Sequence, residues 1–144
     1  MKKGTIALLV VGVFILALVM GTLTTYNGLV SKDEAVATAW GNVQSQYQRR
    51  ADLVPNLVST VKGYAKHESE TLEGVVAARA KATQITVNAD ELTSEKLKQY
   101  QAAQGELSQA LGRLMAIQEN YPQLKANENF SELQAQLEGT ENRI

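Results

Sequence analysis

The sequence contains no cysteine, one histidine and two prolines among its 144 residues. A chain without cysteine cannot form disulfides, thiolate zinc sites, iron–sulfur clusters, a cysteine nucleophile or a lipidated cysteine. A clustered excess of positive charge is missing as well, because 14 Lys and Arg stand against 15 Asp and Glu for a net charge of -1. Nucleic acid is therefore not an expected partner, since phosphate binding needs such an excess. The length suits one small domain.

Charge is also absent from the first part of the chain. No charged side chain occurs between Lys3 and Lys32, and residues 5–25 read TIALLVVGVFILALVMGTLTT. As a helix this segment spans roughly 31 Å, which matches the hydrocarbon core of a bilayer. We expect residues 1–30 to form an uncleaved single-pass anchor in the cell membrane that contacts lipid over about residues 5–25. A cleaved signal peptide is the alternative, but residues 20–28 (MGTLTTYNG) offer no good pair of small residues for cleavage.

The charges that flank the apolar segment indicate its orientation. Lys2 and Lys3 precede it, whereas Lys32 and the more distant Arg49 and Arg50 follow it. The local bias of positive charge favours an N-terminus inside the cell and a domain on the extracytoplasmic side.

Residues 31–144 show helical periodicity and no alternating, β-rich run. We expect one long helix over residues 32–66, opened by a capping box of Ser31 and Glu34, and a second over Thr71 to about Ile85. A third should start at the N-cap Thr93, and a fourth at the N-cap Asn127. The heptad seam of the first comprises Val36, Trp40, Val43, Tyr47, Arg50, Val54, Leu57, Val61 and Tyr64, and that of the third Leu97, Tyr100, Gln104, Leu107, Leu111, Leu114, Gln118 and Tyr121.

Short connections between these helices favour antiparallel neighbours. The expected fold class is therefore all-α: an N-terminal transmembrane helix followed, in residues 31–144, by an antiparallel up-and-down four-helix bundle. The last helix carries no stop signal before Ile144 and is expected to be truncated there.

The main candidate site is a polar cluster around Pro55 that comprises Arg49, Arg50, Asp52, Asn56 and, from the next helix, Arg79. Pro55 removes one backbone hydrogen bond, which the side chain of Asp52 or Asn56 could compensate. Arg50 occupies a seam position, where it must be paired or extend its charged end to the surface. Arg79 and Glu141 are candidate partners in a polar layer. The cluster is either a polar layer that fixes the register of the bundle or a docking site for a partner protein.

Motifs of catalysis are missing. His67 and Glu68 resemble the start of H-E-x-x-H, but Thr71 occupies the position of the second histidine. No G-x-S-x-G elbow and no phosphate-binding glycine loop occurs. We expect no enzymatic activity, no cofactor and no metal. Trp40, Tyr47 and Tyr64, at heptad spacing, are expected in the core.

Two long stretches resemble the LemA family of bacterial membrane proteins. One contains AW, NV, Q and RR followed by ADLVPNLVSTVKGYAKHESETLEGVVAARA (Ala39 to Ala80), and the other is YPQLKANENFSELQAQLEGTENRI (Tyr121 to Ile144). The resemblance implies an anchored antiparallel four-helix bundle and no established reaction. Such proteins are often encoded near membrane metalloproteases, and a relative occurs among magnetosome membrane proteins.

Together these features predict a membrane-anchored, non-enzymatic helical interaction or scaffold protein of the bacterial envelope. Its partner would be another envelope protein, with a membrane metalloprotease as one candidate, or a second copy of itself. The alternative is a self-associating structural or membrane-remodelling protein.

Overall fold

The computed structural model describes residues 2–144, and each regular element in that range is a helix. The chain divides into two compact units, one ending at Ala39 and the other spanning Trp40–Ile144. The predicted all-α class is confirmed.

The first helix, α1, spans Lys3–Tyr64 without a break. Ser31 is helical and lies in its interior, so the prediction that a capping box at Ser31 and Glu34 starts a new helix is wrong. Continuing the helix gives each backbone amide of this stretch an intrahelical partner, whereas a side-chain cap would satisfy only one or two.

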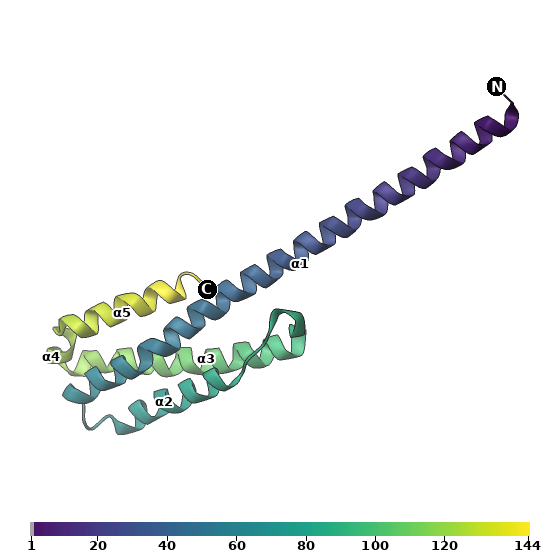
Figure 1. Cartoon of the computed structure of the whole chain (residues 1–144). Coiled ribbons are helices and arrows are strands. Elements are labelled where there is room, and N and C mark those ends of the chain that lie inside the picture. Colours follow the sequence, from purple (N-terminus) through teal and green to yellow (C-terminus); the bar gives the residue numbers. More distant parts are fainter. Residues whose placement is uncertain (1) are drawn as a thin grey trace. The chain divides into compact units, whose positions relative to one another are not determined.

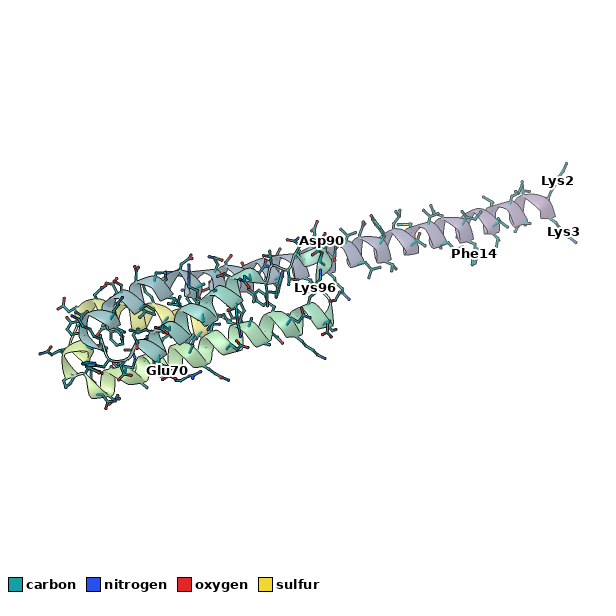
Figure 2. All side chains as sticks on the ribbon, turned by 90° about the horizontal axis from the view of Figure 1, so that it is seen from below. Lys2, Lys3, Phe14, Glu70, Asp90 and Lys96 are labelled. Atoms are coloured by element: carbon teal, nitrogen blue, oxygen red, sulfur yellow. The ribbon has the colours of Figure 1, made fainter. Side chains whose placement is uncertain are left out.

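The part of α1 between Ile6 and Val30 is apolar and exposed. Its large apolar side chains from Ile6 to Val30 are between 40% and 74% exposed, and Figure 2 shows side chains such as Phe14 projecting from all around the helix. The most apolar stretch has a mean hydropathy of 2.9, and none of it is buried. The predicted apolar helix near the N-terminus, long enough to cross a bilayer, is confirmed.

Hydroxyl groups in this apolar stretch are satisfied within the helix. Those of Thr22, Thr24 and Thr25 each donate to a backbone carbonyl three or four residues earlier, at 2.8–2.9 Å. This pairing removes the cost of placing an unbonded hydroxyl in hydrocarbon.

The second unit contains the C-terminal part of α1 and the shorter helices. Successive long helices run in opposite directions and lie side by side, as predicted for an up-and-down bundle (Figure 1). The remaining elements are α2 (Ser69–Gln84), the 3₁₀ turn η1 (Ala89–Glu91), α3 (Ser94–Ala116), the 3₁₀ turn η2 (Ile117–Asn120), α4 (Pro122–Lys125) and α5 (Glu128–Glu141).

Two predicted helix starts are confirmed by their caps. Thr93 Oγ1 accepts a hydrogen bond from the amide of Lys96 at 3.2 Å, and Asn127 Oδ1 accepts one from the amide of Phe130 at 2.9 Å. Each cap satisfies an amide that the first turn of a helix leaves unpaired.

The core of the bundle draws on all its long helices. Its fully buried side chains include Leu57 and Val61 of α1, Val75 of α2, Leu107 of α3 and Phe130 of α5. The predicted seams supply most of these contacts, because positions three and four apart lie on one face of a helix.

Two predicted seam residues lie outside the core. Val36 is 51% exposed and belongs to the first unit. Tyr64, the last residue of α1, is 39% exposed and accepts a hydrogen bond from Asn127 Nδ2 at 2.8 Å. The prediction that Tyr64 is a core residue is wrong, because its hydroxyl is used at the bundle surface to bind the turn before α5.

Candidate functional site: a buried arginine layer

The structure separates the five residues of the predicted polar cluster. Arg50 is only 3% exposed, and Arg79 is partly buried. Arg49, Asp52 and Asn56 are exposed on the outer side of α1. The cluster therefore consists of two arginines that enter the bundle and three polar residues that remain on its surface.

Arg50 is held by neutral groups of α3. Its Nη1 donates to Ser108 Oγ at 2.7 Å, and its Nη2 donates to both the backbone oxygen and Oε1 of Gln104 at 3.1 Å. We call Arg50, Gln104 and Ser108 the arginine layer. Gln104, in the predicted seam of α3, thus meets Arg50, in the predicted seam of α1. Such a contact is typical of a polar layer between two helices.

Carboxylates do not pair directly with this guanidinium. Among residues 2–144, no acidic oxygen lies within 4 Å of Arg50, so Glu141 forms no ion pair with it. Of the two predicted partners of the polar layer, Arg79 contacts the cluster at the backbone oxygen of Ala51. Burial lowers the pKa of Arg50, and Tyr47, Glu141 and Tyr100 act weakly in the opposite direction. Arginine nevertheless stays protonated in proteins, so the layer carries a buried positive charge.

One donor and one acceptor near the layer lack partners. Arg50 Nε and Gln46 Oε1 are both buried without a hydrogen bond. They lie four residues apart on α1 and thus on the same face. The arginine layer is therefore not fully satisfied, and its contribution to stability is correspondingly reduced.

Aromatic rings surround the charge on one side. The Arg50 guanidinium lies 4.9 Å from the centroid of the Tyr47 ring, a favourable cation–π distance. Tyr47 packs edge-on against Tyr100 at 5.5 Å, and Trp40 packs edge-on against Tyr100 at 5.1 Å. Burial raises the pKa of Tyr100. The neighbouring Tyr47 raises this pKa further, whereas the positive charge of Arg50 lowers it.

Arg79 performs a separate task at Pro55. Its Nε donates to the backbone oxygen of Ala51 at 2.8 Å. Ala51 is four residues before Pro55, so its oxygen is the one that loses an intrahelical N–H. The predicted compensation by Asp52 or Asn56 is wrong, because a side chain on the neighbouring helix reaches this carbonyl while Asp52 Oδ1 accepts from Gln48 instead.

The contact of Trp40 and Gln44 with the backbone of Val87 was not predicted from the sequence. Trp40 Nε1 and Gln44 Nε2 both donate to the backbone oxygen of Val87, at 2.8 and 2.6 Å. Val87 belongs to the extended segment after α2, which starts at Ile85. Ile85 and Val87 are apolar and stand two residues apart. This spacing is typical of extended backbone and could have revealed the segment from the sequence.

Comparison with known proteins identifies the compact unit. The LemA family model matches residues 39–144, which begins one residue before the bundle unit at Trp40. The chain belongs to the LemA family. The family match includes both arginines of the bundle interior and the groups of α3 that bind Arg50.

Curated relatives of this LemA-family chain are two proteins of Paramagnetospirillum magneticum (strain ATCC 700264 / AMB-1), the magnetosome proteins MamQ 1 and MamQ 2. Each is 30% identical over 158 aligned residues, which cover 96% of this chain and 57% of the relative. The chain thus spans little more than half the length of these relatives. Family membership and the apolar helix describe a membrane-associated helical protein.

The arginine layer of the LemA bundle is formed entirely by groups of one chain. Its guanidinium is directed into the bundle and is bound by groups of the same chain. A permanently protonated arginine does not transfer protons, and Ser108 Oγ accepts a hydrogen bond from Arg50 Nη1. In the part of the chain that the structure describes, no three His, Cys, Asp or Glu side chains gather in a way that could hold a metal ion.

Proposed function

We propose that this LemA-family protein is a membrane-anchored, non-enzymatic interaction protein that presents a helical bundle to another protein of the bacterial envelope. One observation carries the proposal: the exposed apolar segment and the first helix of the packed bundle are both parts of helix α1. A bundle that follows directly on an apolar helix suits a protein that presents a surface at a membrane.

The bundle interior supports this proposal. Its two interior arginines are bound to groups of the chain itself, at Gln104, Ser108 and Ala51. Interaction with a partner would therefore use exposed parts of the helices, and Arg49, Asp52 and Asn56 are among the residues exposed on α1. Docking at the polar cluster to which these three residues belong was one of the alternatives that the sequence left open.

The extracytoplasmic side is part of the proposal. Lys2 and Lys3 stand immediately before the apolar stretch, whereas only Lys32 follows it closely. This distribution matches the positive-inside rule for an N-terminus in the cytoplasm.

Photo-crosslinking in living cells tests the proposal. A photoreactive amino acid is placed at Arg49, at Gln99 and at Gln109, which are exposed on α1 and α3, and as a control at the fully buried Leu57. We expect at least one exposed position to capture the same envelope protein reproducibly, and Leu57 to capture none. Capture of the chain's own copies alone would replace the proposal by the alternative, a self-associating structural or membrane-remodelling protein.

A further inference from the structure

A groove between α1 and α2 has an apolar floor that the bundle leaves open. Its volume is about 600 Å³. The floor combines Leu72, which is buried, with Val76, which is 51% exposed. The other apolar side chains that line it are Val58, Ala77 and Ala80.

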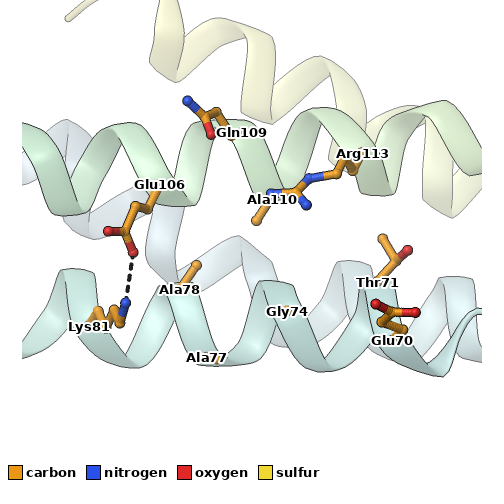
Figure 3. A pocket seen from close by; sticks show the side chains of 10 residues that line it. All are labelled: Glu70, Thr71, Gly74, Ala77, Ala78, Lys81, Glu106, Gln109, Ala110 and Arg113. Carbon is orange, nitrogen blue, oxygen red and sulfur yellow. Dashed lines mark hydrogen bonds and ion pairs between the residues drawn. The ribbon is translucent and has the colours of Figure 1, made fainter.

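The neighbouring groove between α2 and α3 is built differently. Figure 3 shows Lys81 of α2 and Glu106 of α3 reaching across it, and their charged atoms lie 3.0 Å apart. Glu70, Gln109 and Arg113 add further polar groups to its walls. A crossing ion pair and a polar lining make this second groove a solvated surface.

The α1–α2 groove has charges at its edge that are not used within the chain. Lys62, in the last turn of α1, and Lys66, in the turn that follows, line it from one side, and Glu73 of α2 lines it as well. Within residues 2–144 none of these three side chains forms an ion pair. The two unpaired lysines border the apolar strip on the side of α1 and the turn after it, whereas the single carboxylate, Glu73, belongs to α2. The lysine side is complementary to an apolar surface that carries carboxylates on one edge.

We propose that the groove between α1 and α2 binds one amphipathic, acidic-edged helix of the envelope partner. The shape favours a helix because two antiparallel neighbours leave a groove into which the ridge of a third helix packs. The apolar side chains of the ligand, at positions i, i+3, i+4 and i+7, would cover Val76 and Leu72. Its carboxylates would face Lys62 and Lys66. This inference rests on the proposed interaction function and specifies its surface.

Fluorescently labelled synthetic peptides provide the probe. The acidic peptide has leucines at i, i+3, i+4 and i+7 and glutamates along one edge, and the matched basic peptide has lysines at the same edge positions. Binding to the full chain is measured by fluorescence anisotropy in nanodiscs of zwitterionic phosphatidylcholine, and the signal of each peptide with empty nanodiscs is subtracted, because an anionic lipid would attract the basic peptide. We expect the acidic peptide to bind more tightly than the basic one.

Variants locate the binding. Val76→Glu should weaken binding of the acidic peptide about tenfold, because the apolar contact is lost and a like charge is introduced. Val36→Glu is the matched control, since Val36 has the same exposed fraction and lies outside the groove, and it should leave binding unchanged. Ala80→Glu gives a second variant of the floor. Circular dichroism verifies that each variant remains helical.

Reversing the two lysine charges at the edge of the groove tests whether they bind the carboxylates of the peptide. The double variant Lys62→Glu/Lys66→Glu should weaken binding of the acidic peptide about threefold to tenfold, as expected for two exposed ion pairs, and strengthen binding of the basic peptide. Lys98→Glu on α3 controls for net charge. Equal affinity for both peptides, or full affinity in Val76→Glu, overturns the inference, as does a dimer of the chain that Val76→Glu dissociates.

The inference and the proposed function fail separately. If crosslinks from Arg49, Gln99 or Gln109 capture an envelope protein while the groove variants leave peptide binding unchanged, the interaction function stands and the groove is not its surface.

Discussion

Arg79 on α2 donates through Nε to the backbone oxygen of Ala51 on α1, at 2.8 Å. This is the carbonyl that Pro55 deprives of its intrahelical partner. A proline that weakens one helix therefore creates the acceptor that joins it to the next. The position of α2 against α1 and the presence of Pro55 are consequently coupled.

This coupling predicts non-additive mutations. Arg79→Met should lower the free energy of unfolding by about 1–2 kcal/mol, because a partly buried carbonyl loses its donor. In the Pro55→Ala background the loss should be smaller, since the amide of residue 55 can then bind Ala51. The measurement is urea unfolding of the full chain in detergent micelles, followed by circular dichroism. Arg113→Met, at an exposed arginine of α3, serves as the control, and equal losses in both backgrounds would refute the coupling.

The arginine layer predicts an unusual order of substitutions. Arg50→Lys keeps a buried charge but loses the planar fork that reaches Gln104 and Ser108, whereas Arg50→Met removes the charge. Arg50→Lys should therefore destabilise the bundle by about 2 kcal/mol more than Arg50→Met. The same unfolding experiment measures both. Substitutions of the exposed Arg49 by Lys or Met should each stay within about 0.5 kcal/mol; a more stable Arg50→Lys than Arg50→Met would contradict the account.

Tyr100 predicts a loss of stability at high pH. Burial raises its pKa above the ordinary value of 10.0, so the folded chain keeps a phenol proton that the unfolded chain releases. This contribution is complete below pH 10 and is lost as the pH rises through the pKa of the folded state. As the pH rises from neutral through the pKa of the folded state, the free energy of unfolding should fall less for Tyr100→Phe than for the parent protein. Tyr26→Phe, at an exposed tyrosine, is the control variant.

The proposed topology predicts which side of the membrane carries the bundle. Because the chain contains no cysteine, a single cysteine can be labelled without background. Gln99→Cys, on the exposed face of α3, should react with a membrane-impermeant maleimide in intact cells. Lys2→Cys should react only after the cells are permeabilised. The reverse pattern would place the bundle in the cytoplasm.

The sequence by itself determined the helical class, the apolar anchor and most of the core. These features follow from local patterns: an uncharged stretch of bilayer length, heptad spacing through Leu57, Leu107 and Leu111, and caps at Thr93 and Asn127. Each depends on residues within a few turns of one another, so a single helix is enough to reveal it.

Partners of the interior polar groups were decided only by the tertiary structure. Arg50 donates to the neutral Gln104 and Ser108. Arg79 donates to a backbone oxygen, and Trp40 donates to that of Val87. The partners in these hydrogen bonds are 28 to 58 residues apart along the chain. Periodicity fixes which face of a helix is buried, but it does not fix which neighbour lies opposite or at what height. Once the helices are packed, these pairings depend on which polar groups each side chain is long enough to contact and on the carbonyl that Pro55 leaves without an intrahelical donor.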